Sequence, residues 1–227
     1  MGNYKSSFLN KLISILFAIS LVFFIISFSI GIPIYFRPFY YMQIDSLNLE
    51  EETGHSKEEI IDAYNEMLDY LTLGKDFGVG AFKYSETGKN HFYDCKILFD
   101  LNLTALITSF LILCLITVIC KLKSKKLWMP FGFHISFYAA ISTLLVFATL
   151  GLLISLNFKK AFLIFHKLLF PGKSNWYFNI KTDPIILALP NKFFMNAAIA
   201  IISSIIIICL SLVIIAVCRK GKKPFRG

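Results

Sequence analysis

The sequence has few charged residues: they make up 16% of its 227 residues, whereas 56% are hydrophobic. Soluble domains carry about 25% charged residues, so this composition indicates an integral membrane protein. Several catalytic motifs are also missing, namely the Gly-x-Ser-x-Gly elbow, His-Glu-x-x-His, Cys-x-x-Cys and a glycine-rich phosphate loop. Their absence excludes the hydrolases, metalloproteases, redox proteins and nucleotide-binding enzymes that depend on them.

Cysteines are few and badly placed for disulfides. Four of the five, Cys114, Cys120, Cys209 and Cys218, lie inside long apolar segments or at their ends. Only Cys95 lies in a polar region of the chain, where it has no second cysteine to pair with. A disulfide framework is therefore excluded.

Four apolar segments are long enough to cross about 30 Å of hydrocarbon. The sequence predicts an all-α integral membrane protein with four transmembrane helices and a small, mainly helical extracellular cap. We expect the first segment to be a retained anchor, because it is longer than a signal-peptide core and lacks a small-x-small cleavage site. The predicted order is a cytoplasmic N-terminus (1–11), a first span (12–34), a first extracellular cap segment (35–100), a second span (101–120), a cytoplasmic link (121–130), a third span (131–156), a second extracellular cap segment (157–192), a fourth span (193–218) and a cytoplasmic tail (219–227).

The charges predict the orientation. Eleven basic residues flank the spans on one side: Lys5, Lys11, Lys121, Lys123, Lys125, Lys126, Arg219, Lys220, Lys222, Lys223 and Arg226. By the positive-inside rule, both termini and the link face the cytoplasm. All 14 acidic residues then lie outside, 13 of them between Arg37 and Asp100. The net charge of +9 is thus a topology signal rather than a sign of nucleic-acid binding. We attribute the six lysines of residues 157–192 to contact with anionic lipid headgroups.

The outer segments carry helix signals. Ser56 and Glu59 form a capping box, an apolar stripe follows at helical spacing, and Gly74 ends the helix. Residues 74–88 are rich in glycine and are either irregular or paired as short strands. Residues 90–100 are expected to continue directly into the second span. Phe158, Ala161, Phe162, Phe165 and Leu169 form the apolar stripe of a helix lying in the membrane interface.

Histidines are the candidate catalytic groups, since they alone outside the spans titrate near neutral pH without perturbation. His55 and His134 are expected to have no role. His91 and His166 are both predicted near the junction of cap and membrane. Three other interpretations stay open for them: polar residues satisfied at an interface, a Cys95–His91 nucleophile, or a zinc site made of His91, Cys95, His166 and Asp183.

Aromatic residues are dense on both outer segments. They include Tyr35, Phe36, Phe39, Tyr40, Tyr41, Trp176, Tyr177 and Phe178. Most of them are explained by an interfacial belt. Their density also suggests an apolar pocket at the outer leaflet, suited to acyl chains.

Several short stretches resemble one family. They are residues 49–60 (LEEETGHSKEEI), 91–94 (HFYD), 165–166 (FH), 170–172 (FPG), 175–176 (NW), 182–185 (TDPI) and 189–190 (LP). In this order they are similar to the lipoprotein intramolecular transacylase family of four-span bacterial membrane enzymes. The resemblance covers nearly the whole chain and is most specific in the second outer segment.

The resemblance implies an acyltransferase that moves an acyl chain from the sn-2 ester of S-diacylglyceryl-cysteine to the α-amine of the same cysteine. The product is a lyso-form lipoprotein. The substrates would be diacylated lipoproteins in the bacterial cytoplasmic membrane, with the site at its extracellular face among membrane lipids. No cofactor or metal is implied, and the oligomeric state stays open.

The resemblance also implies site residues. The catalytic histidines are His91 and His166: we expect His166 to be the base and His91 to orient the substrate or stabilise the oxyanion, although the roles can be exchanged. Asn175, Trp176 and Asp183 are expected to bind substrate, with Asp183 orienting a histidine or holding the amine. Residues 74–88 match less clearly, which leaves lipoprotein selectivity open.

Two alternative functions remain at this point. One is a different outer-leaflet acyl or peptide hydrolase that uses Cys95 or zinc. The other is a non-catalytic accessory subunit of a membrane complex. Transport by the chain itself is disfavoured, since the spans contain almost no ionisable side chains.

Overall fold

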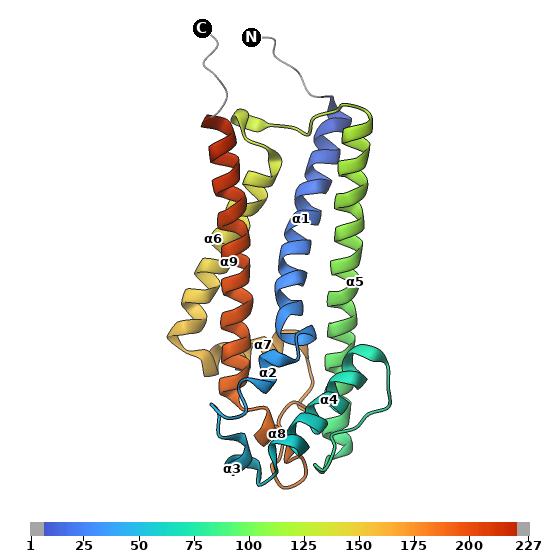
Figure 1. Ribbon diagram of the computed structural model, residues 1–227, viewed down its shortest axis with the longest axis vertical. Coiled ribbons are helices and arrows are strands. Elements are labelled where there is room, and N and C mark those ends of the chain that lie inside the picture. Colours follow the sequence, from blue (N-terminus) through green and yellow to red (C-terminus); the bar gives the residue numbers. More distant parts are fainter. Residues whose placement is uncertain (1–6, 222–227) are drawn as a thin grey trace. The chain divides into compact units, whose positions relative to one another are not determined.

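Helices make up the regular structure of the computed structural model, which describes residues 7–221; no strand occurs within that range. Lys5, Lys222, Lys223 and Arg226, used above to predict orientation, lie outside the described residues. The helices are α1 (Phe8–Tyr35), α2 (Pro38–Tyr41), α3 (Leu49–Thr53), α4 (Lys57–Leu73), α5 (Glu86–Leu122), a 3-10 turn (Pro130–Gly132), α6 (Ile135–Leu156), α7 (Phe158–Leu169), α8 (Ile185–Ala188) and α9 (Asn191–Gly221). Figure 1 shows their order.

Four of these helices, α1, α5, α6 and α9, are long and apolar enough to cross a membrane. Each is close to a span expected from the sequence. Helix α5 begins at Glu86, well before its apolar stretch starts at Leu101, so residues 90–100 continue into the span as expected. The all-α membrane fold with four apolar helices is therefore confirmed.

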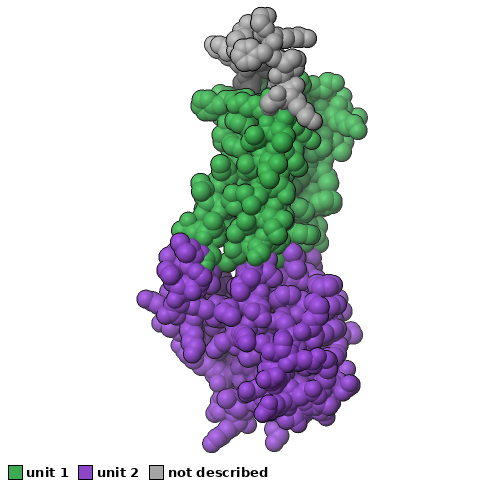
Figure 2. All heavy atoms as spheres, turned by 60° about the vertical axis from the view of Figure 1, so that its left-hand side comes forward, with its two compact units in different colours: residues 1–29, 104–151, 202–227 green, residues 30–103, 152–201 purple. Residues whose placement is uncertain are grey.

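The chain forms two compact units, coloured separately in Figure 2. Unit 1 comprises residues 1–29, 104–151 and 202–227. In it, the backbone N–H of Trp128 donates to Ser14 Oγ at 2.8 Å, and Asn10 Nδ2 donates to the Lys126 carbonyl at 3.1 Å. These bonds hold the link after α5 against the beginning of α1.

Unit 2 comprises residues 30–103 and 152–201 and contains the short helices α2, α3, α4 and α8, which lie together in Figure 1. Helix α4 begins at the predicted capping box: Ser56 Oγ accepts from the Glu59 N–H, and Glu59 Oε2 accepts from the Ser56 N–H. Gly74, in the left-handed conformation at φ 71°, ends the helix. The helix predicted from the sequence is confirmed.

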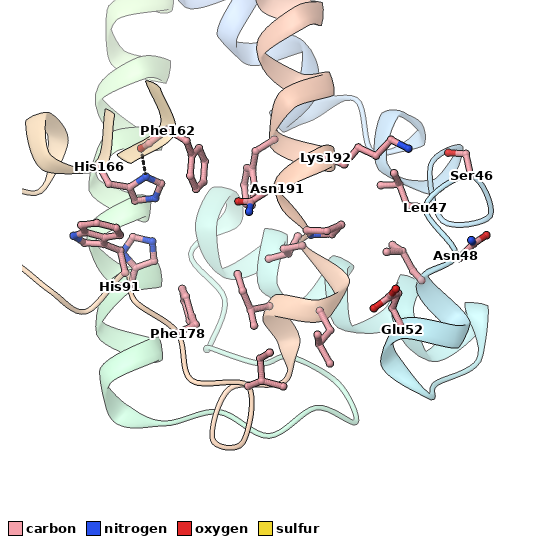
Figure 3. Close-up of a pocket in the computed structure, with 18 residues that line it drawn as sticks. Ser46, Leu47, Asn48, Glu52, His91, Phe162, His166, Phe178, Asn191 and Lys192 are labelled. Atoms are coloured by element: carbon pink, nitrogen blue, oxygen red, sulfur yellow. Dashed lines mark hydrogen bonds between the residues drawn. The ribbon is translucent and has the colours of Figure 1, made fainter. Parts of the chain in front are cut away.

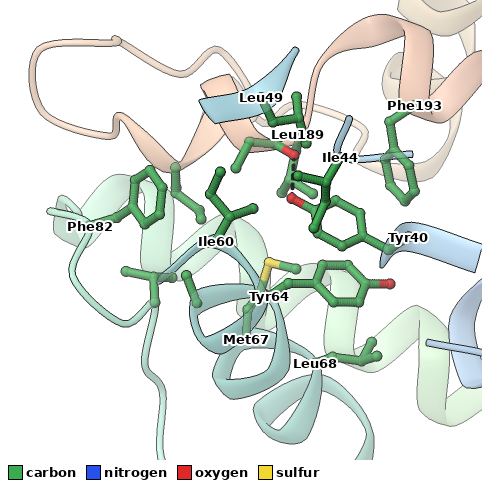
Figure 4. Close-up of a cluster of buried hydrophobic side chains, with 14 of the residues drawn as sticks. Tyr40, Ile44, Leu49, Ile60, Tyr64, Met67, Leu68, Phe82, Leu189 and Phe193 are labelled. Atoms are coloured by element: carbon green, nitrogen blue, oxygen red, sulfur yellow. Dashed lines mark hydrogen bonds between the residues drawn. The ribbon is translucent and has the colours of Figure 1, made fainter. Parts of the chain in front are cut away.

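The core of unit 2 is an apolar cluster between these short helices (Figure 4). The rings of Tyr40 and Tyr64 stack with centroids 3.8 Å apart, and the Tyr40 hydroxyl donates to the Ala188 carbonyl at 2.8 Å. Ile44, Leu49 and Ile60 are fully buried around them. This core holds α8 and the beginning of α9 beside α4, which supports one wall of the site described next.

Residues 74–85 form no strand. The backbone there is held by side chains instead, since Glu66 Oε2 accepts a hydrogen bond from the Gly80 N–H at 2.7 Å. The segment packs inward through Val79 and Phe82, which are buried. The irregular alternative expected for this glycine-rich stretch is the one that the structure adopts.

Candidate active site

His91 and His166 meet in unit 2, one from the first turns of α5 and the other from the last turn of α7. Their ring centroids lie 6.0 Å apart at an interplanar angle of 30°. Both side chains are buried, with only 6% and 8% of the residue surface exposed. Figure 3 shows the two rings on the same side of one pocket.

Aromatic side chains surround the pair. Phe162 and Trp176 contact His166, with centroids 4.3 and 4.9 Å from its ring. Phe170 and Phe178 contact His91 at 4.9 and 5.5 Å. These rings exclude water from the histidines, so ionising either imidazole loses hydration that the surroundings do not replace.

His166 is held in a defined protonation state. Burial lowers its pKa below the ordinary value, so the ring is neutral at pH 7. Its Nδ1 lies 2.8 Å from the Phe162 carbonyl, which can only accept, so Nδ1 carries the proton. The Nε2 atom of His166 therefore has a free lone pair, and the residue can act as a base.

His91 is neutral as well. Burial, followed by the nearby His166, lowers its pKa to about 4. Its Nε2 lies 3.5 Å from Cys95 Sγ, one helical turn further along α5. Its Nδ1 is buried and has no hydrogen-bond partner within residues 7–221. A buried polar atom without a partner costs free energy, which is consistent with a site that acquires its partner when substrate binds.

The pocket has a volume of about 560 Å³. Besides the histidines it is lined mainly by apolar side chains, among them Leu47, Ile186 and Leu189. Polar residues Ser46, Asn48, Glu52 and Lys192 lie at the end away from the histidines (Figure 3). The pocket thus suits an amphipathic ligand whose reacting group lies beside the imidazoles.

A bracket of polar contacts holds the 170–178 loop to α5. Asp94 accepts hydrogen bonds from Lys173 Nζ and, at 2.8 Å, from Asn175 Nδ2. Burial alone would raise the pKa of Asp94, but these two bonds bring it below the ordinary value. Trp176 donates from Nε1 to the Lys173 carbonyl at 3.0 Å. The bracket, defined here as Asp94, Lys173 and Asn175, therefore fixes the indole ring beside His166.

The side chain of Asp183, from the loop before α8, contacts the residues at the beginning of α5. One of its oxygens, Oδ1, accepts from the Ser85 backbone N–H at 2.7 Å, and Oδ2 accepts from the Thr182 hydroxyl at 2.6 Å. Gly88 packs directly against the same carboxylate, because a Cβ there would lie 2.2 Å from Oδ1. Asp183 is not among the residues that line the pocket. Its hydrogen bonds hold the second cap segment to the helix that carries His91.

The cysteine and zinc interpretations receive little support. Burial raises the pKa of the Cys95 thiol to about 12, whereas a nucleophilic cysteine must ionise. Within residues 7–221, no three side chains of histidine, cysteine, aspartate or glutamate converge as metal ligands. Of the four residues considered as a zinc set, His91 is near Cys95 and near His166, but no three of the four form a group that could hold a metal ion.

Sequence reasoning assigned no role in the site to Asp94, and it attributed Lys173 to contact with lipid headgroups. One signal was present: Asp94 follows His91 by three residues, so both lie on neighbouring positions of one helix face. The partners of Asp94 had no such signal, because they belong to a loop without periodicity. Phe162 and Phe178 were assigned to an apolar stripe and an aromatic belt, and the structure also places them against the histidines.

Known proteins resemble the chain along most of its length. The family model described as lipoprotein intramolecular transacylase Lit matches residues 15–194. A solved structure of the membrane-integral lipoprotein intramolecular transacylase Lit from Bacillus cereus is 30% identical, with a TM-score of 0.82, and the match covers 94% of this chain and 98% of that one.

Two further structures of the Bacillus cereus protein carry a histidine replaced by arginine or by alanine. They are 28% and 29% identical to the chain, each with a TM-score of 0.75. The matches cover 95% of this chain and 95% of the arginine variant, and 94% of this chain and 96% of the alanine variant. No curated protein sequence matches the chain. With a family model matching well over half of its length, the chain belongs to the lipoprotein intramolecular transacylase family and is an acyltransferase.

Proposed function

We propose that this protein moves an acyl chain from the sn-2 ester of a diacylglyceryl-cysteine lipoprotein to the α-amine of that cysteine. The observation that carries the proposal is the pair of neutral, buried histidines in one largely apolar pocket, with a lone pair on His166 Nε2 and an unpartnered Nδ1 on His91. These atoms supply what ester aminolysis needs.

The amine needs a base. An α-amine with a pKa near 8 is only about a tenth neutral at pH 7. We infer that His166 Nε2 takes a proton from the amine nitrogen as that nitrogen attacks the ester carbon. Proton transfer of this kind contributes roughly 100- to 10,000-fold to a rate.

The bond changes balance without any other reactant. A bond forms between the amine nitrogen and the acyl carbon, and the bond from that carbon to the sn-2 oxygen breaks. The proton held by His166 passes to the departing glyceryl oxygen, so the reaction is an isomerisation. His91 faces the same space and is proposed to stabilise the oxyanion of the tetrahedral intermediate.

The closeness of the reacting amine and ester supplies much of the remaining rate enhancement. Amine and ester belong to the same substrate molecule, so a pocket that folds them together can use effective molarities of roughly 10⁵ M or more. No acyl-enzyme is needed, which fits a site whose one nearby thiol has a raised pKa. Trp176, which lines the pocket beside His166, is proposed to contact the substrate. Asn175 and Asp183 are proposed to act through the loop and helix that they hold.

The membrane placement belongs to the proposal as well. We infer that both termini and the link at residues 121–130 face the cytoplasm, because the link carries four lysines and no acidic residue. The pocket then opens at the extracellular face. Helix α7 has the pattern of an interfacial helix, since Ile164, Phe165 and Leu168 are exposed beside Lys167, and we infer that it lies at the membrane surface.

The test is to co-express the protein with a diacylglyceryl lipoprotein in a bacterium that lacks N-acylation and to fragment the N-terminal lipopeptide by tandem mass spectrometry. Fragmentation is required because an isomerisation leaves the intact mass unchanged. We expect one chain on nitrogen and one on glycerol, with the native protein and with the control His55→Asn but not with His166→Asn. Two chains on glycerol in the presence of folded native protein would refute the proposal.

A further inference from the structure

Cys95 contacts the imidazole of His91 on the side that faces away from the unpartnered nitrogen. Its Sγ lies 3.5 Å from His91 Nε2, and both residues belong to α5, one turn apart. The thiol packs against the apolar core of unit 2. No other hydrogen-bond partner of the His91 ring occurs among the described residues.

The chemistry of the two groups sets the direction of this hydrogen bond. The thiol is protonated, because burial raises its pKa. Sulfur is a weak acceptor, whereas an unprotonated imidazole nitrogen is a good one, so the stronger arrangement has the S–H donating to Nε2. A neutral imidazole carries one proton, which then resides on Nδ1.

We propose that Cys95 is a positioning residue that holds His91 in the tautomer protonated at Nδ1, so that this N–H is available to donate to the oxyanion of the substrate. The proposal rests on the proposed function. It also separates the roles of the two histidines, because the Phe162 carbonyl leaves His166 with a lone pair on Nε2. One histidine then accepts a proton while the other donates a hydrogen bond.

The ring of His91 is buried, which strengthens the hydrogen bonds that it can donate. Only 6% of the residue is exposed, and its Nδ1 lacks a partner. A donor in such a place is not compensated by solvent, so it interacts strongly with charge that develops on a ligand. The ring lines the pocket and lies 6.0 Å from the His166 ring, which puts both groups within reach of one ester.

The direct test is nitrogen NMR of the full chain in detergent, labelled with ¹⁵N-histidine. Long-range proton–nitrogen correlations distinguish a protonated from an unprotonated ring nitrogen, and the His91 signals are those lost in His91→Asn. We expect a protonated Nδ1 and an unprotonated Nε2 on His91 of the native protein. A protonated Nε2, with Sγ as acceptor, would overturn the proposal. This spectrum requires no activity, so it stands independently of the acyl-transfer assay.

Variants of Cys95 add two measurements, the tautomer of His91 and kcat, that would not change together if the cysteine only filled space. In Cys95→Ala we expect the His91 tautomers to become mixed and kcat to fall by about 5- to 10-fold, the factor that one ordinary hydrogen bond supports, with KM nearly unchanged. Cys95→Ser keeps a donor and should restore both the spectrum and kcat. Cys114→Ala removes an exposed thiol from the same helix and should change neither. Equal activity and equal spectra for the alanine and native proteins would refute the positioning role.

Discussion

The imidazoles of His91 and His166 lie side by side with centroids 6.0 Å apart, although one belongs to a membrane-crossing helix and the other to a short helix much later in the chain. The two rings are neutral and differ in their contacts. His166 is bonded at Nδ1 to a carbonyl, whereas His91 contacts a thiol at Nε2. This difference assigns separate roles to two residues of the same type.

Replacing His166 by asparagine should lower kcat by roughly 100- to 10,000-fold, the range for loss of one proton-transfer group. Replacing His91 by asparagine should lower kcat by roughly 100- to 1,000-fold, the range for loss of one oxyanion donor. KM should change little, because the apolar lining of the pocket remains. The measurement is initial rates with a synthetic diacylglyceryl lipopeptide and the purified variants. His55→Asn is the matched control on the cap, and an unchanged rate for His166→Asn would contradict the assignment.

The pH dependence should be set mainly by the substrate. Burial lowers the pKa of both histidines below 6.5, so they are already neutral at pH 7. The rate should therefore rise with pH up to the pKa of the α-amine, near 8. Any inflection caused by the histidines should lie below 6.5. The contradicting result would be a kcat/KM that falls at acid pH only between pH 6.5 and 7.5, with the midpoint of this fall shifted in His166→Gln. It would mean that burial does not lower the pKa of His166.

Stability should follow the same pKa shifts with a defined sign. The folded histidines stay neutral where the unfolded ones, with a pKa near 6.5, take up protons. Unfolding is therefore favoured by acid: the contribution of the pair is fully present above pH 6.5 and is lost as the pH falls below it. Thermal unfolding in detergent at pH 7.5 and 5.5 should show a smaller drop for His91→Asn than for the native protein. Equal drops would show that the pKa of His91 is the same in the folded and in the unfolded protein.

The bracket should control the indole beside His166. Asp94→Ala leaves Lys173 and Asn175 without their acceptor, so Trp176 should become more mobile and more hydrated. In a Trp128→Phe background, which leaves one tryptophan, we expect a red shift of the emission and about a tenfold loss of kcat.

The control for the bracket is Asp45→Ala, since Asp45 pairs with Lys57 on an exposed surface of the same unit and its side chain is 70% exposed. Exposed ion pairs contribute little, so neither emission nor rate should change. A native spectrum in Asp94→Ala would show that the loop is held by other contacts.

Gly88→Ala should destabilise the fold. The added Cβ would lie 2.2 Å from Asp183 Oδ1 and 3.1 Å from Phe178 Cε1. The carboxylate of Asp183 must then move away and lose its hydrogen bond from the Ser85 N–H. Overpacking of this kind costs about 1–3 kcal/mol. The midpoint of thermal unfolding should fall by several degrees, whereas Thr87→Ala, at the exposed neighbouring position, should have little effect. A native midpoint would mean that the carboxylate moves without cost.

The sequence was informative where regular patterns or local contacts decide the structure. Long apolar runs predicted the four long helices, Ser56 and Glu59 predicted the beginning of α4, and residues 90–100 were expected to continue directly into the second span, as they do in α5. Loop conformation depends instead on partners far apart in the chain. Ser85 with Asp183 and Asp94 with Lys173 are such pairs, and neither produces a periodic pattern that would identify its partner. For this reason an apolar pocket could be expected from the density of aromatic residues, but the residues that line it could not be predicted.

The central claim is that the acyl chain passes directly from ester to amine within one substrate molecule. The most direct measurement is a crossover experiment with purified protein and two diacylglyceryl lipopeptides that differ in both peptide mass and acyl isotope label. Tandem mass spectrometry then shows which acyl chain each amine carries. We predict that every N-acyl group comes from the glycerol of its own peptide. N-acyl groups exchanged between the two peptides would contradict direct intramolecular transfer and would indicate an acyl-enzyme or transfer between two substrates.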